Sequence, residues 1–170
     1  MRRRGRGSGE RLAAVLLLLF LPATSPAQDA APTGAEARLH ELVNRHRRNY
    51  GCPPLDWYAP AAAVAEHRAA DMIERRYFDH VTPDGHDVFD ELREAGIRAR
   101  KTAENIALTQ AGASAAFELW RDSPPHRLNL DDCAFTDEAI GERGGVWVQI
   151  LLERPRSGSE VSPPAASPGH

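Results

Sequence analysis

The chain has 170 residues, with 21 Lys and Arg against 24 Asp and Glu and a formal net charge of −3, and this length predicts one domain rather than two. Residues 1–27 contain five arginines and Glu10, a net charge of +4, so the rest of the chain carries −3 − 4 = −7. This acidic balance excludes a general nucleic-acid binder, because phosphate contacts depend on clustered Lys and Arg. The arginines in "NRHRRN", "ERR" and "IRARK" are interpreted as solvated helix faces.

The first 27 residues have the pattern of a secretory signal peptide. The basic "MRRRGRGSGER" precedes the apolar "LAAVLLLLFLPA", and small residues follow before Gln28. An apolar run of about 12 residues is too short to span a bilayer of roughly 30 Å, which disfavours the alternative of an uncleaved membrane anchor. We expect cleavage after Ala27, export to the periplasm or the extracellular space, and no stable membrane span afterwards.

Three helical patterns open the remaining chain. Residues 36–50 place five residues on one helical stripe before the stop at Gly51, namely Leu39, Leu42, Val43, His46 and Tyr50. After a Pro-rich loop, residues 59–78 predict an Ala-rich helix with Val64, Ala65, Met72 and Ile73 inward and with close packing against a neighbour. A "TPDG" turn then leads to a short helix that ends at Gly96.

The second half of the chain predicts a small sheet between helices. Residues 97–108 are expected to begin as a strand and end as a loop, and residues 114–120 to form a helix capped by Ser114. Residues 138–152 predict two short strands across a Gly-Gly turn, and the second, "VWVQILL", is apolar on both faces and therefore covered on both. Helices beside such a hairpin imply an α/β fold with three α-β-α layers.

The two cysteines, Cys52 and Cys133, predict one disulfide, since an exported protein with an even cysteine count favours pairing. Closing a loop of roughly 80 residues stabilises by about 4 to 5 kcal/mol in the chain-entropy model. The alternative, a reactive or metal-bound thiol, lacks a neighbouring His or Arg. Residues 154–170 are rich in Pro, Ser, Gly and Ala and predict a disordered tail, which leaves a folded domain at residues 35–153.

Six histidines lie in the predicted domain, and two of them differ from the rest. His40 and His46 belong to the first helix, His67 is interpreted as a surface residue, and His86 as the start of the short helix.

His80 and His126 each follow a helix and stand on a loop before a turn, where functional polar groups collect. Glu104 is a lone acid ahead of an apolar segment, and a buried carboxylate needs a partner or neutralisation. Spacing alone matches no short metal motif such as HExxH, so three unrelated surface groups stay an alternative.

Five segments, taken in order, resemble the CAP superfamily of cysteine-rich secretory proteins, antigen 5 and pathogenesis-related 1 proteins, specifically its compact bacterial SCP-like branch. They are "LVNRHRRNYGCPPLDW", "ADMIERRYFDHVTPDG", "AENIAL", "LWRDSPPHRLNL" and "FTDEAIGERGGVWVQIL". The resemblance covers about Leu39 to Leu152 and implies an α-β-α sandwich with a small, largely antiparallel sheet. It also implies a ligand-binding cleft in which His80, Glu104 and His126 converge.

The chain departs from the larger members of that family at three places. A second acid of the family lies on the helix that carries Trp120, but this chain has Ser123 three residues later, and Asp122 and Glu118 are no clean match. Pro125 stands where the family prefers Gly, and Ala139 where the family has no side chain.

Two chemical uses of such a cleft follow. His80 and His126 together could bind Zn²⁺ or another divalent cation at about 2.1 Å per nitrogen, with Glu104 orienting one imidazole or acting as a general base on metal-bound water. That site would be a metal-dependent peptide or ester hydrolase. With the fourth acid missing, the sequence favours a binding module for an extracellular lipid, cell-wall fragment or peptide, and no residue is assigned a catalytic role. A structural interaction domain without a functional cleft is the third alternative.

Overall fold

The computed structural model describes residues 31–32 and 34–155, so the predicted signal peptide and all but the first two residues of the predicted tail lie outside the described residues. The described part consists of nine elements, α1 Gly34–Tyr50, β1 Asp56–Trp57, α2 Ala59–Glu74, α3 Val88–Glu94, β2 Lys101–Leu108, α4 Ala113–Asp122, α5 Pro124–Leu130, β3 Asp137–Arg143 and β4 Val146–Glu153. No helix among the described residues is long and apolar enough to cross a membrane.

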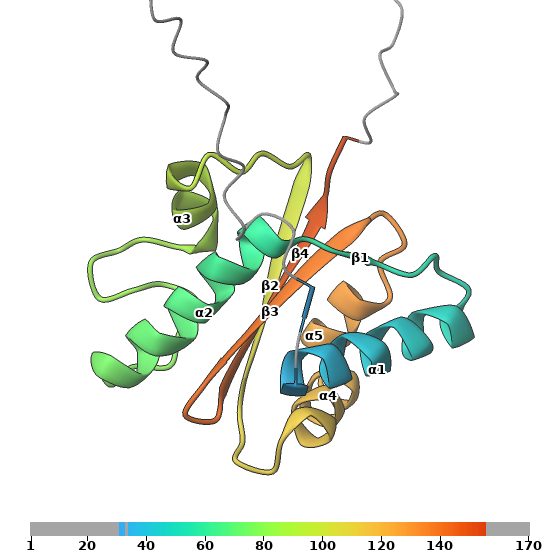
Figure 1. Cartoon of the computed structure of the whole chain (residues 1–170), viewed down its shortest axis with the longest axis horizontal. Coiled ribbons are helices and arrows are strands. Elements are labelled where there is room, and N and C mark those ends of the chain that lie inside the picture. Colours follow the sequence, from blue (N-terminus) through green and yellow to red (C-terminus); the bar gives the residue numbers. More distant parts are fainter. Residues whose placement is uncertain (1–30, 33, 156–170) are drawn as a thin grey trace, which may run out of the picture.

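The strands form one sheet in the order β1-β3-β4-β2, between two groups of helices (Figure 1). Only the short β1 pairs in parallel, while β3, β4 and β2 are antiparallel neighbours. Helices α2 and α3 cover one face and α1, α4 and α5 the other, and each face has its own apolar core. The predicted α-β-α sandwich is confirmed.

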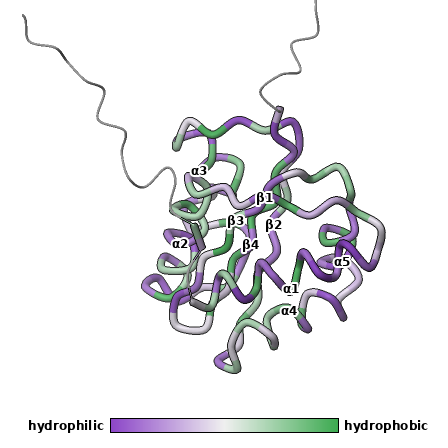
Figure 2. Tube along the Cα trace, turned by 45° about the vertical axis from the view of Figure 1, so that its right-hand side comes forward, coloured by the Kyte–Doolittle hydropathy of each residue, from purple (hydrophilic) through white to green (hydrophobic). Residues whose placement is uncertain are grey.

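The apolar strand β4 lies at the centre of this fold. Its first seven residues, 146–152, are all buried, as a strand that is apolar on both faces requires. The predicted Gly-Gly turn joins it to β3, with Gly144 at φ 58° and Gly145 at φ 86°, the positive values of a type I′ hairpin turn. Along α1 and α2, hydrophobic and hydrophilic residues alternate with the helical period (Figure 2), so each helix buries one face.

The alanines of α2 permit a very close approach to β3. Ala61, Ala65 and Ala69 are fully buried, and a Cβ placed on Gly141 of β3 would lie 2.3 Å from the backbone nitrogen of Glu66. No side chain fits there, which explains why a glycine stands at this position of the strand. The predicted close packing of the Ala-rich helix is confirmed.

Several local predictions are wrong, each for a tertiary reason. Residues 97–100 form the loop and Lys101–Leu108 the strand, because β2 pairs along the whole length of β4. Helix α4 begins at Ala113 after Gly112 at φ 84°, so Ser114 is not its cap. Ile73 is 42% exposed and does not join the core, since α2 buries the stripe through Met72 instead.

Helix α5 stands where a loop carrying His126 was predicted. Pro124 and Pro125 occupy its first two positions, where a helix needs no backbone N–H donor. His126 therefore lies in the first turn of a seven-residue helix rather than on a loop. The position of this helix decides where the His126 ring lies.

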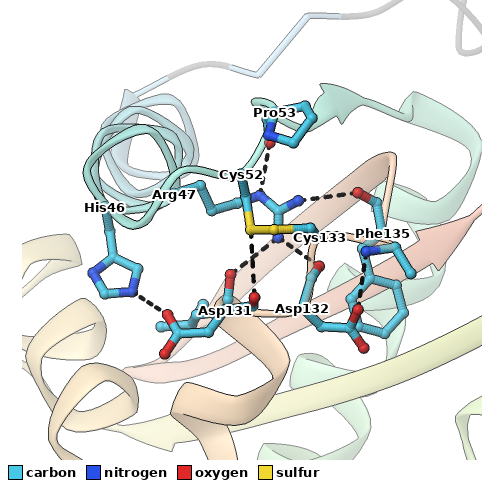
Figure 3. The surroundings of a disulfide bond; sticks show 10 residues. His46, Arg47, Cys52, Pro53, Asp131, Asp132, Cys133 and Phe135 are labelled. Carbon is cyan, nitrogen blue, oxygen red and sulfur yellow. Dashed lines mark hydrogen bonds and ion pairs between the residues drawn. A yellow bond between two sulfur atoms is a disulfide. The ribbon is translucent and has the colours of Figure 1, made fainter.

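The predicted disulfide is confirmed and anchors the end of α5. Cys52 and Cys133 are bonded with their Cα atoms 5.0 Å apart, an ordinary separation (Figure 3). Beside it His46 Nε2 contacts Asp131 Oδ1 at 2.6 Å. The bridge ties the loop after α1 to the loop after α5.

Arg47, predicted to be solvated, is fully buried next to this bridge. Its guanidinium donates to four backbone carbonyls at 2.9 to 3.0 Å, those of Pro53, Leu130, Asp132 and Phe135. One side chain thus fastens α1 to both loops of the disulfide. An arginine with five donors in a fixed fork can satisfy this many carbonyls at once.

Candidate functional site

The site starts from Glu104 in β2, whose side chain is only 3% exposed. Side chains alternate along a strand, so Glu104 faces α2 while Asn105 faces the opposite helices. Arg68 of α2, itself fully buried, meets the carboxylate with two bonds, Nε to Oε1 at 2.5 Å and Nη2 to Oε2 at 3.2 Å. A carboxylate buried this deeply needs such a partner, because an unpaired buried charge is costly.

His80 completes the arrangement around Glu104. It lies in the bend after α2, and its Nδ1 contacts Glu104 Oε2 at 2.8 Å. Arg68 Nη2 also donates to the backbone carbonyl of His80 at 2.9 Å. The same guanidinium therefore fixes both the histidine backbone and the carboxylate that orients its ring.

The Glu104 contact has an electrostatic consequence for His80. The hydrogen bond to Glu104 raises the pKa of His80 above its ordinary value, although partial burial opposes the shift. The side chain is 51% exposed, and within the described part of the chain its Nε2 makes no hydrogen bond. The arrangement offers solvent an imidazole that carries a proton more readily than a free histidine.

His126 has the opposite character. Its Nδ1 is buried without a hydrogen-bond partner among the described residues. Burial lowers the pKa of His126, and the charge of nearby His80 lowers it further. The surroundings of the two imidazoles thus shift their pKa values in opposite directions, upward for His80 and downward for His126.

The predicted triad is therefore brought together in part. His80 and Glu104 are hydrogen-bonded, and His126 lies close enough to interact electrostatically with His80. No hydrogen bond joins His126 to either partner within the described residues. Glu104 belongs to a strand and His126 to a helix, so only His80 lies on a loop as predicted.

Arg68 was not predicted from the sequence as part of the site. It lies on the buried stripe of α2, three residues after Ala65 and four before Met72, and this spacing was the available signal. Nor was Glu91 of α3 predicted, which contacts Arg68 Nη1 through Oε1 at 2.6 Å and leaves Oε2 buried without a partner among the described residues.

No acid of α4 takes the place of the family's fourth residue. Glu118, Asp122 and Ser123 instead line a separate hollow with Leu108 and Leu119. Asp122 is paired with its neighbour Arg121. Within the described residues, neither acid contacts His80 or Glu104.

The donor set suits a metal ion only incompletely. Within residues 31–32 and 34–155, no group of three or more His, Cys, Asp or Glu side chains is arranged to hold a metal ion. His80, with Nδ1 on a carboxylate, has the orientation typical of a metal-binding imidazole. Glu104 is a poor ligand, because both of its oxygens already accept hydrogen bonds from Arg68 or His80.

Comparison with known proteins identifies the family to which the sequence belongs. The sequence model of the cysteine-rich secretory protein family, CAP, matches residues 40–141, more than half of the chain. The chain belongs to the CAP family. The matched range begins at His40 in α1 and ends at Gly141 in β3, so it includes His80, Glu104 and His126.

The CAP domain has two similar proteins in Bacillus subtilis. It is 30% identical over 131 residues to the uncharacterized protein YkwD, and the aligned region covers 76% of this chain and 51% of YkwD. It is 31% identical over 122 residues to the uncharacterized membrane protein YlbC, and the aligned region covers 72% of this chain and 35% of YlbC. The chain thus spans about half or less of the length of these relatives.

Solved structures confirm the CAP fold. An extracellular protein containing an SCP domain from Bacillus anthracis superposes with a TM-score of 0.69 at 26% identity, covering 74% of this chain and 45% of that one. A cysteine-rich secretory protein from Staphylococcus aureus has a TM-score of 0.62 at 19% identity, covering 71% and 38%. An outer surface protein from Borrelia burgdorferi has a TM-score of 0.61 at 18% identity, covering 69% and 91%.

Proposed function

We propose that this CAP domain is an extracellular binding module that holds an anionic group of its ligand on His80, with His126 beside it. The observation that supports the proposal most is the fixed direction of His80. Its Nδ1 contacts the buried Glu104, and half of its side chain is exposed. Export rests on the signal-peptide pattern and on the similarity to an extracellular SCP-domain protein.

The charges around the site indicate how a ligand would be recognised. When His80 is protonated, Arg68 and His80 balance Glu104 and Glu91, so these four side chains together carry no net charge. Recognition therefore depends on the directional N–H of His80 rather than on a broad positive potential, and charge-assisted hydrogen bonds of this kind are the strong ones. A carboxylate or phosphate oxygen fits such a donor. Peptides, cell-wall fragments and lipids all carry groups of this class.

A peptide titration tests the proposal. Short peptides are synthesised twice, with a free C-terminal carboxylate and as the C-terminal amide, and inorganic phosphate serves as a third probe. Binding is followed by ¹H–¹⁵N chemical-shift changes in the wild type, in His80→Ala and in His67→Ala. His67 is an exposed histidine of α2 and provides the matched control.

The expected result is saturable binding of the carboxylate form to the wild type and to His67→Ala, and its loss in His80→Ala. Binding should also weaken as the pH rises through the raised pKa of His80. Equal binding of acid and amide, or binding that survives His80→Ala, contradicts the proposal. If His80→Ala/His126→Ala costs stability but leaves binding unchanged, the histidines are structural.

The metal-dependent hydrolase is a second candidate, favoured by two imidazole nitrogens that have no hydrogen-bond partner among the described residues, Nε2 of His80 and Nδ1 of His126. Calorimetry with Zn²⁺ on the wild type and on His80→Ala/His126→Ala tests it, and equal heats remove it. Glu104 is poorly placed to act as the base, because both of its oxygens already accept hydrogen bonds from Arg68 or His80. Hydrolysis of a peptide and ester library that is abolished by Glu104→Gln would reverse this preference.

A further inference from the structure

A chain of hydrogen-bonded amide side chains that ends at a carboxylate, with all but its first member fully buried, crosses the sheet beneath α1 and α5. Asn129 Nδ2 donates to Asn105 Oδ1 at 2.8 Å, Asn105 Nδ2 donates to Gln149 Oε1 at 2.9 Å, and Gln149 Nε2 donates to Glu138 Oε2 at 2.5 Å. The other oxygen of Glu138 contacts His40 Nδ1 at 2.6 Å. We call Asn129, Asn105, Gln149 and Glu138 the amide chain.

The carboxylate at one end fixes the direction of every amide. A carboxylate only accepts hydrogen bonds, so Gln149 turns its NH₂ toward Glu138 and its oxygen toward Asn105. Asn105 must then present its NH₂ to Gln149 and its oxygen to Asn129. Asn105 Nδ2 also donates its second hydrogen to the backbone carbonyl of His126, with 3.3 Å between the nitrogen and the oxygen.

Burial prevents these groups from changing partners. Asn105, Gln149 and Glu138 are all fully buried. A flipped Asn105 would place its oxygen against two carbonyl-type acceptors, and no solvent could compensate for the lost bonds. The side chain of Asn105 therefore has one stable orientation.

Helix α5 needs external contacts of this kind. It has seven residues and begins with two prolines, and an isolated helix of this length is not stable in water. Arg47 and the disulfide hold its far end, near Leu130 and Cys133. Asn105 contacts the first turn through the carbonyl of His126 and the next turn through Asn129.

We propose that Asn105 is a positioning residue that sets the ring of His126 relative to His80. Consecutive residues of β2 then perform matched tasks on opposite faces of the sheet, since Glu104 orients His80 and Asn105 holds the turn that carries His126. The amide chain supplies the rigidity. The importance of the His126 ring position for ligand recognition rests on the proposed function, but the ring position itself can be tested in the free protein.

Histidine ring NMR of Asn105→Ala provides the test. Imidazole ¹H–¹⁵N spectra are recorded across pH for the wild type, Asn105→Ala and Ile106→Val. Ile106 is the next residue of β2, is buried toward α2 and provides a control for a general weakening of the strand. A purely structural role for Asn105 would lower stability without changing one histidine selectively.

The expected result is that Asn105→Ala moves the pKa of His126 back toward 6.5, because a displaced ring loses the burial that lowers it, while His80 keeps its value. Ile106→Val should change neither. Should Asn105→Ala not fold, Asn129→Ala removes one partner at a part-buried position and should shift His126 the same way by less. An unchanged His126 in a folded Asn105→Ala, or in Asn129→Ala if only that variant folds, overturns the inference.

The outcome is separable from the binding proposal. Failure of carboxylate peptides to bind the wild type ends the binding proposal, yet leaves the His126 shift in the free protein as a valid test of Asn105. Conversely, if the wild type binds carboxylate peptides but the pKa of His126 is unchanged in Asn105→Ala, the binding proposal stands and this inference is overturned.

Discussion

Replacing Arg68 by Met removes the cation on which the whole site depends. The guanidinium and the Glu104 side chain are 0% and 3% exposed, and Glu91 on the other side is 14% exposed. Removing one partner of a buried ion pair leaves an uncompensated charge and typically costs about 3 to 5 kcal/mol. We expect Arg68→Met to lower the free energy of unfolding by that amount at neutral pH.

A double-mutant cycle isolates the cause. Replacing a buried pair by neutral groups of similar volume is often close to neutral, so Arg68→Met/Glu104→Gln should recover most of the loss. Arg45→Met provides the matched control, because Arg45 forms an exposed pair with Glu41 and should cost less than about 1 kcal/mol. Urea unfolding followed by circular dichroism measures all of these variants.

The reasoning is refuted if Arg68→Met costs no more than Arg45→Met. It is also refuted if adding Glu104→Gln gives no recovery, since the loss would then come from packing rather than from the stranded carboxylate.

Three further predictions concern the framework and the pH dependence. Cys52→Ser/Cys133→Ser should lower the free energy of unfolding by about 4 to 5 kcal/mol, from a sequence separation of 81 residues, and a loss below about 1 kcal/mol in denaturant unfolding would show that loop closure is not the main term. Gly141→Ala should cost about 3 kcal/mol or more in thermal unfolding, because its Cβ would lie 2.3 Å from backbone atoms of α2, and an unchanged melting temperature would contradict that packing. The folded state binds the His80 proton more tightly than the unfolded state, so protonation of His80 stabilises the fold below pH 6.5, and this stabilisation disappears as the pH rises through the raised pKa of His80. His126 has a lowered pKa in the folded state, so it destabilises the fold as the pH falls below 6.5. The cost of His80→Ala should therefore be larger at about pH 5.5 than at pH 8.5 and that of His126→Ala smaller, and parallel pH profiles would contradict both assignments.

Much of the fold could be predicted from local patterns. The apolar run 146–152 and the Gly-Gly turn predicted a covered central hairpin, and the order of the family segments predicted the sandwich around it. Strand β2 was misplaced within its segment, since its bounds come from pairing with β4 and not from its own residues. The helix after the two prolines was also missed, because seven residues carry too little periodicity.

The candidate site was predicted less completely, for an electrostatic reason. His80 and Glu104 were identified, but the arginine that makes burial of Glu104 possible was not. Arg47 was interpreted as solvated from its residue type and Arg68 was not singled out, because charged residues are almost never fully buried unless paired. Glu104 lies 36 residues away from Arg68, and three of the four carbonyls that Arg47 binds lie 83 or more residues away from it, so no local window reveals these partners.

The central claim is that the fold raises the pKa of His80 and lowers the pKa of His126. A pH titration of their ring resonances by NMR in the wild-type protein tests it most directly. The account predicts that His80 titrates above 6.5 and His126 below it. Two histidines that both titrate at 6.5, with no response of His80 to Glu104→Gln, would contradict it.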